Sequence, residues 1–126
     1  MSNRIDITQV GPTHHESVIS LLRAVGLPAN DLPPGLQHFF AALDSDHLVG
    51  VIGLETYERD GLLRSLVVKP TYRNRKIATL LVEQAEQLAA NIGLANIFLL
   101  TETAKDFFSK QGYEPIPRDQ APHSLR

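Results

Sequence analysis

A strand, a long amphipathic helix and a second strand follow one another along this chain. Residues 62–68 are largely apolar and end before Pro70, which cannot donate to a sheet ladder. Apolar residues then recur with helical spacing over 77–92, and Gly93 ends the run. Residues 96–100 are almost wholly apolar, which is typical of a strand covered on both faces. This order predicts a right-handed βαβ crossover between two parallel strands.

The segment before this unit predicts a strand and a helix. Residues 4–8 alternate polar and apolar side chains, as a half-buried strand does. Thr13 and Glu16 have the spacing of a capping box at a helix start. Gly26 can adopt the left-handed conformation that ends this helix. The next ten residues, 27–36, contain three prolines and are predicted to form a loop, with room for a short helix.

Further strands and a last helix complete the prediction. Residues 39–43 and 48–56 are strand candidates that form a meander with 62–68. Thr103 can cap a short helix that Gly112 ends. Since no linker or repeat interrupts the chain, we expect one α/β (α+β) domain over residues 1–126.

Composition narrows the functional classes. The 126 residues suffice for one hydrophobic core, and the net charge of −2 is unlike the basic excess of nucleic-acid binders. There are no cysteines, and the five histidines fit no metal-binding spacing. No apolar run has the length of about 18 residues that a membrane span requires. We therefore expect a cytoplasmic protein with no nucleic-acid, membrane or metal partner.

Three cations gather in the loop before the long helix: Arg73, Arg75 and Lys76. The first N–H groups of a helix lack intrahelical partners, and the helix dipole adds partial positive charge there. The predicted first turn carries no acidic residue. Such a junction binds anions such as a pyrophosphate. A solvated basic surface is the alternative that these residues leave open.

Two motifs resemble those of the GNAT acetyltransferases. Val68, Pro70, Arg73 and Ala78 match the strand–V-x-P-x-x-[R/Q]-x-x-G-x-[G/A]–helix signature. Residues 104–113 resemble the family's A-x-x-F-[Y/F]-x-x-x-G-[F/Y] segment, and the likeness extends over roughly residues 4 to 116. Short phrases such as Gly-Leu-Pro, Leu-Arg-Ser-Leu-Val-Val and Phe-Leu-Leu-Thr are similar to the subgroup associated with arsenic-resistance operons.

The resemblance implies a fold, a cofactor and a reaction. The fold would have a mixed central sheet, helices on both faces, and a splayed parallel strand pair joined by the crossover. The reaction would transfer the acetyl group of acetyl-CoA to a primary amine of a small molecule, such as an amino acid-like toxin or an organoarsenical. The residues expected to bind the cofactor are Leu66, Val67, Val68, Arg73, Asn74, Arg75, Lys76, Ile77, Ala78 and Thr79.

Three departures from the family pattern support an alternative. Lys76 stands where the signature has glycine, and a left-handed backbone there would cost a lysine about 1 kcal/mol or more. Phe108 stands where many members have the tyrosine that protonates the thiolate. The C-terminal strand is expected to be short or missing, and a homodimer could cover that sheet edge. The alternative is an acyl-CoA-binding but catalytically weak sensor or partner-binding module.

Amine acetylation requires a proton acceptor, because an amine with a pKa near 10.4 is almost wholly protonated at pH 7. Glu55 and Glu102 lie near predicted strand ends, where ligand sites of open α/β sheets are found. Either could instead be an ordinary exposed carboxylate. A backbone N–H near Val67 or Val68 would stabilise the developing oxyanion.

Arg64 is a charged residue inside an apolar strand. By strand alternation it is expected to share a face with Leu62, Leu66 and Val68, so its charge must be paired or must face a cleft. A salt bridge to an acidic neighbour such as Glu55 is one interpretation. The other is an anchor for an anionic group of the substrate, since guanidinium binds carboxylates through two hydrogen bonds.

Overall fold

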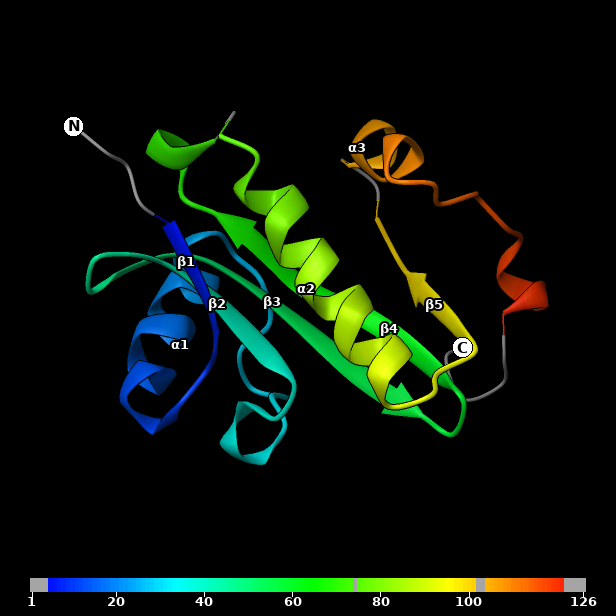
Figure 1. Ribbon diagram of the computed structural model, residues 1–126, viewed down its shortest axis with the longest axis horizontal. Helices are drawn as coiled ribbons and strands as arrows, with labels where there is room; N and C mark the ends of the chain where they lie inside the picture. Colours follow the sequence, from blue (N-terminus) through cyan, green and yellow to red (C-terminus); the bar gives the residue numbers. More distant parts are fainter. Residues whose placement is uncertain (1–4, 74, 102–103, 122–126) are drawn as a thin grey trace.

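The computed structural model describes residues 5–73, 75–101 and 104–121, and its centre is a five-stranded mixed sheet (Figure 1). The strands lie side by side in chain order, and β4 and β5 are the parallel pair. Their bounds are β1 (Ile5–Gln9), β2 (Phe39–Asp44), β3 (His47–Tyr57), β4 (Asp60–Val68) and β5 (Asn96–Leu99). The sheet confirms the predicted mixed α/β architecture.

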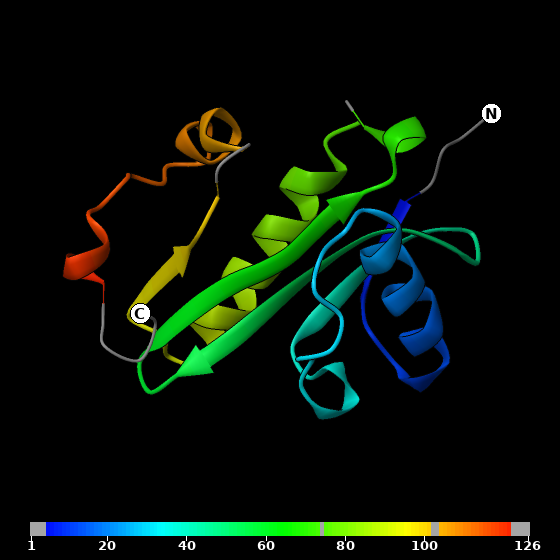
Figure 2. The ribbon, with the colours of Figure 1, turned by 180° about the vertical axis from the view of Figure 1, so that it is seen from behind.

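Helices cover both faces of this sheet, as expected. The α-helices are α1 (His15–Ala24), α2 (Ile77–Asn91) and α3 (Lys105–Lys110). The short 3-10 helices are η1 (Pro12–His14), η2 (Pro34–Leu36), η3 (Pro70–Tyr72) and η4 (Arg118–Gln120). Figure 2, the view from behind, shows α1 in front of the sheet and α2 behind it. Helix α2 crosses between β4 and β5 and therefore forms the predicted βαβ unit.

The sheet separates two hydrophobic clusters. Leu81 and Val82 of α2 pack with the strands on one face, and Val18 and Leu22 of α1 pack on the other. Phe39 is fully buried in the α1-side cluster, where its side chain contributes about 2–3 kcal/mol. Its ring lies directly against Gly53: a Cβ there would meet the ring at 2.4 Å. Glycine is therefore required at this position of β3.

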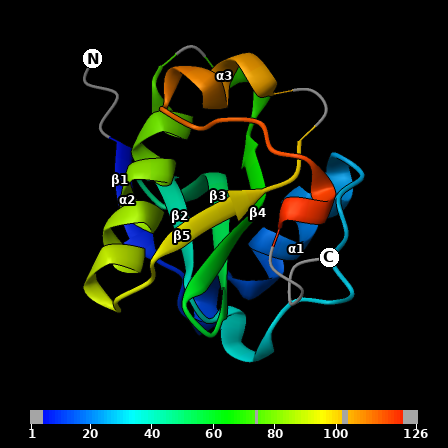
Figure 3. The ribbon, with the colours of Figure 1, turned by 90° about the vertical axis from the view of Figure 1, so that its right-hand side faces the viewer.

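The parallel pair parts halfway along β4. Its ladder ends at Leu63–Leu99, although β4 continues to Val68 (Figure 3). At the same level β4 carries an extra residue against β3, and Ser65 has a positive φ of 60°. These are the marks of a β-bulge, which bends the strand and re-aims its side chains. The splayed pair expected from the sequence is confirmed.

The bulge corrects one expectation about Arg64. Leu66 and Val68 pack in the α2-side cluster, whereas Arg64 contacts the loop that follows α1. The three residues do not share a face, because the extra residue interrupts the alternation between them. The charge therefore lies on the α1 side of the sheet.

The structure corrects two other local predictions. Helix α1 begins at His15, and the Gly11 N–H donates to Nδ1 of His14, so the proposed Thr13–Glu16 capping box is not formed. The four residues of β5 are exposed or half-buried, so this strand is not covered on both faces. The predicted Thr103 cap lies outside the described residues.

The predicted helix ends hold. Gly26, Gly93 and Gly112 have positive φ values of 76°, 83° and 94° and follow α1, α2 and α3. In the described part of the chain no strand follows α3, and residues 113–121 run back on the β5 side of the molecule (Figure 3). No helix of the described ranges is long and apolar enough to cross a membrane.

Candidate active site

A pocket of about 330 Å³ lies where β4 ends and α2 begins. Six of the residues predicted to bind a cofactor line it, together with two that sequence reasoning missed, Tyr72 and Phe107. The six are Val68, Arg73, Lys76, Ile77, Ala78 and Thr79. The strand–loop–helix junction therefore forms a cavity at the predicted place.

The other predicted cofactor residues lie elsewhere. Arg75 is exposed beside the pocket, and its guanidinium carbon lies 5.1 Å from the centre of the Tyr72 ring. Leu66 packs against the α2-side cluster, and the Val67 side chain is buried in the α1-side cluster. Their backbones nevertheless border the splay, because both follow the last β4–β5 pair. Asn74 lies outside the described residues.

Backbone hydrogen bonds fix the basic loop. The Lys69 N–H donates to the Val49 carbonyl at 2.8 Å, and the Tyr72 N–H closes a turn on Lys69, also at 2.8 Å. The Arg73 Nε donates to the Val68 carbonyl at 3.2 Å. The loop is thus attached both to the neighbouring strand and to the end of its own strand, which holds its cations at the pocket rim.

Lys76 has a left-handed backbone, with φ 61° and ψ 18°, at the N-cap of α2. The sequence left open whether this residue is helical or left-handed, and the structure answers the question. A lysine in this conformation costs on the order of 1 kcal/mol. No side chain caps the helix and no acidic residue stands in its first turn. The first N–H groups of α2 and the Lys76 ammonium are therefore placed for an anion.

Tyr72 connects this loop to a distant hairpin. Its hydroxyl donates to Oδ2 of Asp44 at 2.6 Å, at the end of β2. This hydrogen bond, together with a smaller effect of desolvation, raises the pKa of Tyr72. The ring stays neutral and serves as a platform for the Arg75 cation. The sequence feature that could have identified Tyr72 as a site residue is its position as an aromatic residue within a basic loop.

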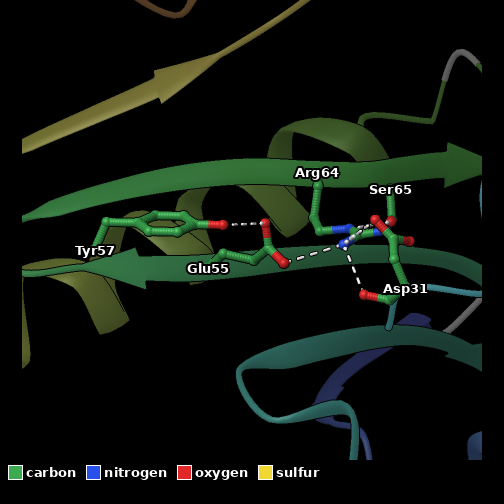
Figure 4. A network of polar contacts seen from close by, with 5 residues as sticks. All are labelled: Asp31, Glu55, Tyr57, Arg64 and Ser65. Atoms are coloured by element: carbon green, nitrogen blue, oxygen red, sulfur yellow. Dashed lines mark hydrogen bonds and ion pairs between the residues drawn. The ribbon is translucent and has the colours of Figure 1, made fainter. Parts of the chain in front are cut away.

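Five polar residues form a second feature, on the α1 side of the sheet: Asp31, Glu55, Tyr57, Arg64 and Ser65 (Figure 4). Arg64 Nη2 donates to Oδ1 of Asp31 at 2.8 Å, and Nη1 donates to Oε2 of Glu55 at 3.1 Å. Arg64 Nε donates to the Ser65 hydroxyl at 3.1 Å. The Tyr57 hydroxyl donates to Oε1 of Glu55 at 3.1 Å. The sequence suggested the pair of Glu55 and Arg64 but not Asp31 or Tyr57.

The charges of this network hold one another in the ionised state. The hydrogen bond from Arg64 holds the pKa of Asp31 below its usual value. Burial alone would lower the pKa of Arg64, but its hydrogen bonds to Asp31 and Glu55 raise it on balance. Burial, and then the hydrogen bond to Glu55, raises the pKa of Tyr57. These contacts therefore favour the charged forms of Asp31 and Arg64 and keep the Tyr57 phenol neutral at neutral pH.

A smaller hollow of about 200 Å³ adjoins the network. It is lined by Pro33, Gln37, His38, Leu54, Glu55, Thr56 and Tyr57. Arg64 lies next to the last β4–β5 pair, so the network stands at the level where the strands begin to part. Glu102, the other predicted proton acceptor, lies outside the described residues.

Phe108 is a core residue. Its side chain is buried, and its ring meets Phe107 and Tyr113 edge-on at centroid distances of 5.0 and 5.4 Å. The Tyr113 hydroxyl donates to Glu86 at 2.8 Å, and burial together with this bond raises its pKa. Tyr113 is therefore a poor proton donor at neutral pH. Among the described residues no cluster of three His, Asp or Glu side chains could hold a metal.

The fold and the pocket define a class: a small α/β domain with a basic loop and a pocket at the end of a splayed parallel strand pair. The family model of the acetyltransferase (GNAT) domain matches residues 35–115, more than half of the chain. The chain belongs to the GNAT acetyltransferase family.

Individual relatives agree with this assignment. An uncharacterized N-acetyltransferase of Chlorobaculum tepidum is 31% identical over 91 residues, which are 71% of this chain and 58% of that protein. An amino-acid acetyltransferase of Enterobacter sp. is 31% identical over 69 residues, 55% of this chain and 16% of that protein. The chain thus spans little more than half of the first relative and a small part of the second.

Solved structures show the same fold. N-acetylglutamate synthase from Neisseria gonorrhoeae, in complex with coenzyme A and N-acetyl-glutamate, has a TM-score of 0.88 at 18% identity. The match covers 99% of this chain and 32% of that one. A GNAT-family acetyltransferase from Staphylococcus aureus has a TM-score of 0.86 at 23% identity, over 98% and 92% of the two chains.

Proposed function

We propose that this protein is an acetyl-CoA-dependent N-acetyltransferase that acts on a small amine carrying an anionic group. The pocket between β4 and α2 carries this proposal: it lies at the start of a helix without an acidic first turn, and cations stand at its rim. Those features suit the pyrophosphate of coenzyme A. The N-acetylglutamate synthase described above was solved with coenzyme A, which supports the same cofactor here.

The residues of the chain suggest a division of labour. Acetyl-CoA supplies an activated acetyl group, whose transfer to an amine nitrogen forms an amide and breaks the thioester C–S bond. Arg73, Arg75 and Lys76 would hold its phosphates. The β4 backbone at Val67 and Val68, beyond the last pair with β5, would donate to the acetyl oxygen as negative charge develops. Glu55 or Glu102 would accept the ammonium proton, directly or through water.

Arg64 would bind the anionic group of the acceptor. Its side chain is 13% exposed, and it stands beside the bulge, where β4 and β5 part. Amino acids fit this chemistry because one molecule carries both an amine and a carboxylate. The amino-acid acetyltransferase relatives support that class. The resemblance to the arsenic-operon subgroup adds amino acid-like toxins and organoarsenicals as candidates.

Two measurements test the proposal. Coenzyme A at a hundred times its Kd should stabilise the protein by about 2.7 kcal/mol, seen as a rise in Tm. Thiol release from acetyl-CoA should then depend on the amine added, from a panel of L-glutamate, L-glutaminamide, spermidine and an arsenical amino acid. No Tm shift at millimolar coenzyme A would refute the cofactor assignment.

The second candidate function is a cofactor-binding module with little or no turnover. The buried Phe108, in the position of the family's tyrosine, favours it. The departing thiol resembles cysteine, with a pKa of about 8.5, and can leave as thiolate, so the loss of tyrosine weakens catalysis without preventing it. A Tm shift without thiol release from any amine would favour the module.

A further inference from the structure

Asp31 binds Arg64 in the way that a ligand carboxylate would. Its Oδ1 lies 2.8 Å from Nη2 and its Oδ2 lies 3.4 Å from Nη1, so both oxygens meet the guanidinium fork. This two-point geometry is the usual one for a carboxylate on arginine. The loop carboxylate therefore fills the position that an anionic acceptor needs.

The two carboxylates bound to Arg64 differ in how firmly they are held. The Glu55 side chain is 22% exposed and has the Tyr57 hydroxyl as a second partner. The Asp31 side chain is 66% exposed and lies in the loop between α1 and η2. An exposed ion pair is weak, and a solvated carboxylate leaves at little cost. Glu55 and Ser65 would keep Arg64 in place after Asp31 has left.

The loop that carries Asp31 is exposed at Asp31 and attached to the core further along. Leu36 is buried in the α1-side cluster and holds the loop to the core. Leu36 and His38 both have positive φ, a strained backbone of the kind that persists only where surrounding contacts maintain it. His38 also lines the hollow beside Glu55. Release of Asp31 would thus loosen the segment that borders this hollow.

We propose that Asp31 is an internal occupant of the carboxylate site on Arg64, and that an anionic acceptor binds by displacing it. This inference rests on the proposed function, because it takes Arg64 as the anchor of the acceptor. Asp31 then makes the site selective: an amine without an anionic group cannot free Arg64 and gains nothing from it. The position of the loop would then depend on whether an acceptor occupies the site.

Asp31→Asn tests the proposal, with L-glutamate as the probe. An exposed ion pair favours its bound form by a factor of up to about five, so its removal should lower the Kd and the KM for L-glutamate about two- to fivefold. Affinity for L-glutaminamide, the same amine without carboxylates, should not change. Asp46→Asn, in the turn between β2 and β3, is the charge-matched control and should behave as wild type.

Two further measurements test the displacement of the loop and the role of the Arg64 guanidinium. L-glutamate should speed amide hydrogen exchange of residues 29–32 in the wild type. The effect should be smaller in Asp31→Asn, where the ion pair is already lost and the backbone carbonyl of residue 31, 3.4 Å from Arg64 Nη1, is the contact that remains. Adding Arg64→Lys to Asp31→Asn should abolish the gain in L-glutamate affinity, because lysine lacks the two-point fork.

The outcomes separate this inference from the proposed function. Equal L-glutamate affinity in wild type and Asp31→Asn, by calorimetry in the presence of coenzyme A, overturns the inference even if the enzyme acetylates glutamate. Tighter L-glutamate binding in Asp31→Asn without thiol release from any amine supports the occupant and refutes the acetyltransferase.

Discussion

The protein has two sites with arginine side chains, and these sites differ in whether the positive charge is paired. In the loop between β4 and α2, Arg73, Arg75 and Lys76 are exposed, and no acidic residue stands in the first turn of α2. On the α1 side of the sheet, the side chain of Arg64 is only 13% exposed and is bound by two carboxylates. The first region is ready for an anion. The second already holds one.

This difference teaches what each region can do without a ligand. Exposed cations keep their hydration and repel one another modestly. A loop anchored to the sheet can therefore hold these cations without paired carboxylates until phosphates bind. A cation with a side chain only 13% exposed needs a paired carboxylate at all times, because an unpaired charge would lose its hydration at a large cost in free energy. A substrate anchor inside the sheet therefore needs a resident partner, and ligand binding there becomes an exchange.

Arg64→Met gives the largest expected effect. Methionine keeps the apolar stem but leaves Glu55 without its cation, so the free energy of unfolding should fall by about 2 kcal/mol, less than the 3–5 kcal/mol of a fully buried pair. Glu55→Gln added to it should restore more than half. Urea denaturation measures both, with Arg23→Met on the exposed face of α1 as control. A loss above about 3 kcal/mol with complete rescue would make Arg64 structural only.

Charge reversal in the loop tests the uncompensated region. Arg73→Glu or Arg75→Glu places a carboxylate where phosphates should bind, so the Kd for coenzyme A should rise about tenfold or more. The effect should shrink at high salt, and the acceptor KM should change little. Calorimetry at two salt concentrations measures it, with Arg59→Glu in the β3–β4 turn as control. An equal loss of affinity for coenzyme A and for the acceptor amine would contradict the assignment of the two ligands to separate regions.

Lys76→Gly should change stability and binding in opposite directions. Glycine relieves the left-handed strain and should add about 1 kcal/mol to the free energy of unfolding. Loss of the ammonium should raise the Kd for coenzyme A by about fivefold, which corresponds to a net contribution of about 1 kcal/mol for one solvent-exposed hydrogen bond. Lys76→Asn, which tolerates this conformation without a charge, should weaken binding to the same extent. Unchanged affinity in both variants would remove Lys76 from the cofactor site.

The sequence predicted the basic loop between β4 and α2 better than the network around Arg64. The anion loop depends on neighbours in the chain, so periodicity and the motif at Val68 and Pro70 located it, and six predicted residues line one pocket. The network around Arg64 depends on tertiary structure. Asp31 lies 33 positions away along the chain, in a proline-rich loop whose path no local pattern fixes.

The bulge explains the main error about Arg64. Its side chain faces α1 rather than sharing a face with Leu66, because one extra residue at Ser65 shifts the alternation. Nothing in the string Leu-Arg-Ser-Leu marks that shift, since bulges are set by pairing with the neighbouring strand. The Thr13–Glu16 capping box did not form, because the 3-10 helix η1 precedes α1 and the His14 ring accepts from the Gly11 N–H.

Tyr72→Phe gives the smallest expected effect and asks how firmly the uncompensated loop is positioned. Phenylalanine keeps the ring beneath Arg75 but loses the 2.6 Å hydrogen bond to Asp44. If this hydrogen bond contributes a net free energy of about 0.5–1 kcal/mol to positioning the loop, its loss should raise the Kd for coenzyme A two- to fivefold. The KM for the acceptor should not change. Asp44→Asn, which keeps an acceptor oxygen, should have the smaller effect of the two.

The pH dependence of the same Kd sharpens this prediction. Because the bond to Asp44 raises the pKa of Tyr72 above the usual value of about 10, its hydroxyl remains a donor throughout the neutral and mildly alkaline range. The ratio of the Kd values of Tyr72→Phe and wild type should therefore be constant up to about pH 10 and should fall only where the wild-type phenol ionises and loses its own bond. A ratio that falls near neutral pH would show that another group positions Arg75. A ratio of one at all pH values would show that the exposed cations bind the anion without a fixed platform, and the loop would then differ from the Arg64 network in preorganisation as well as in charge.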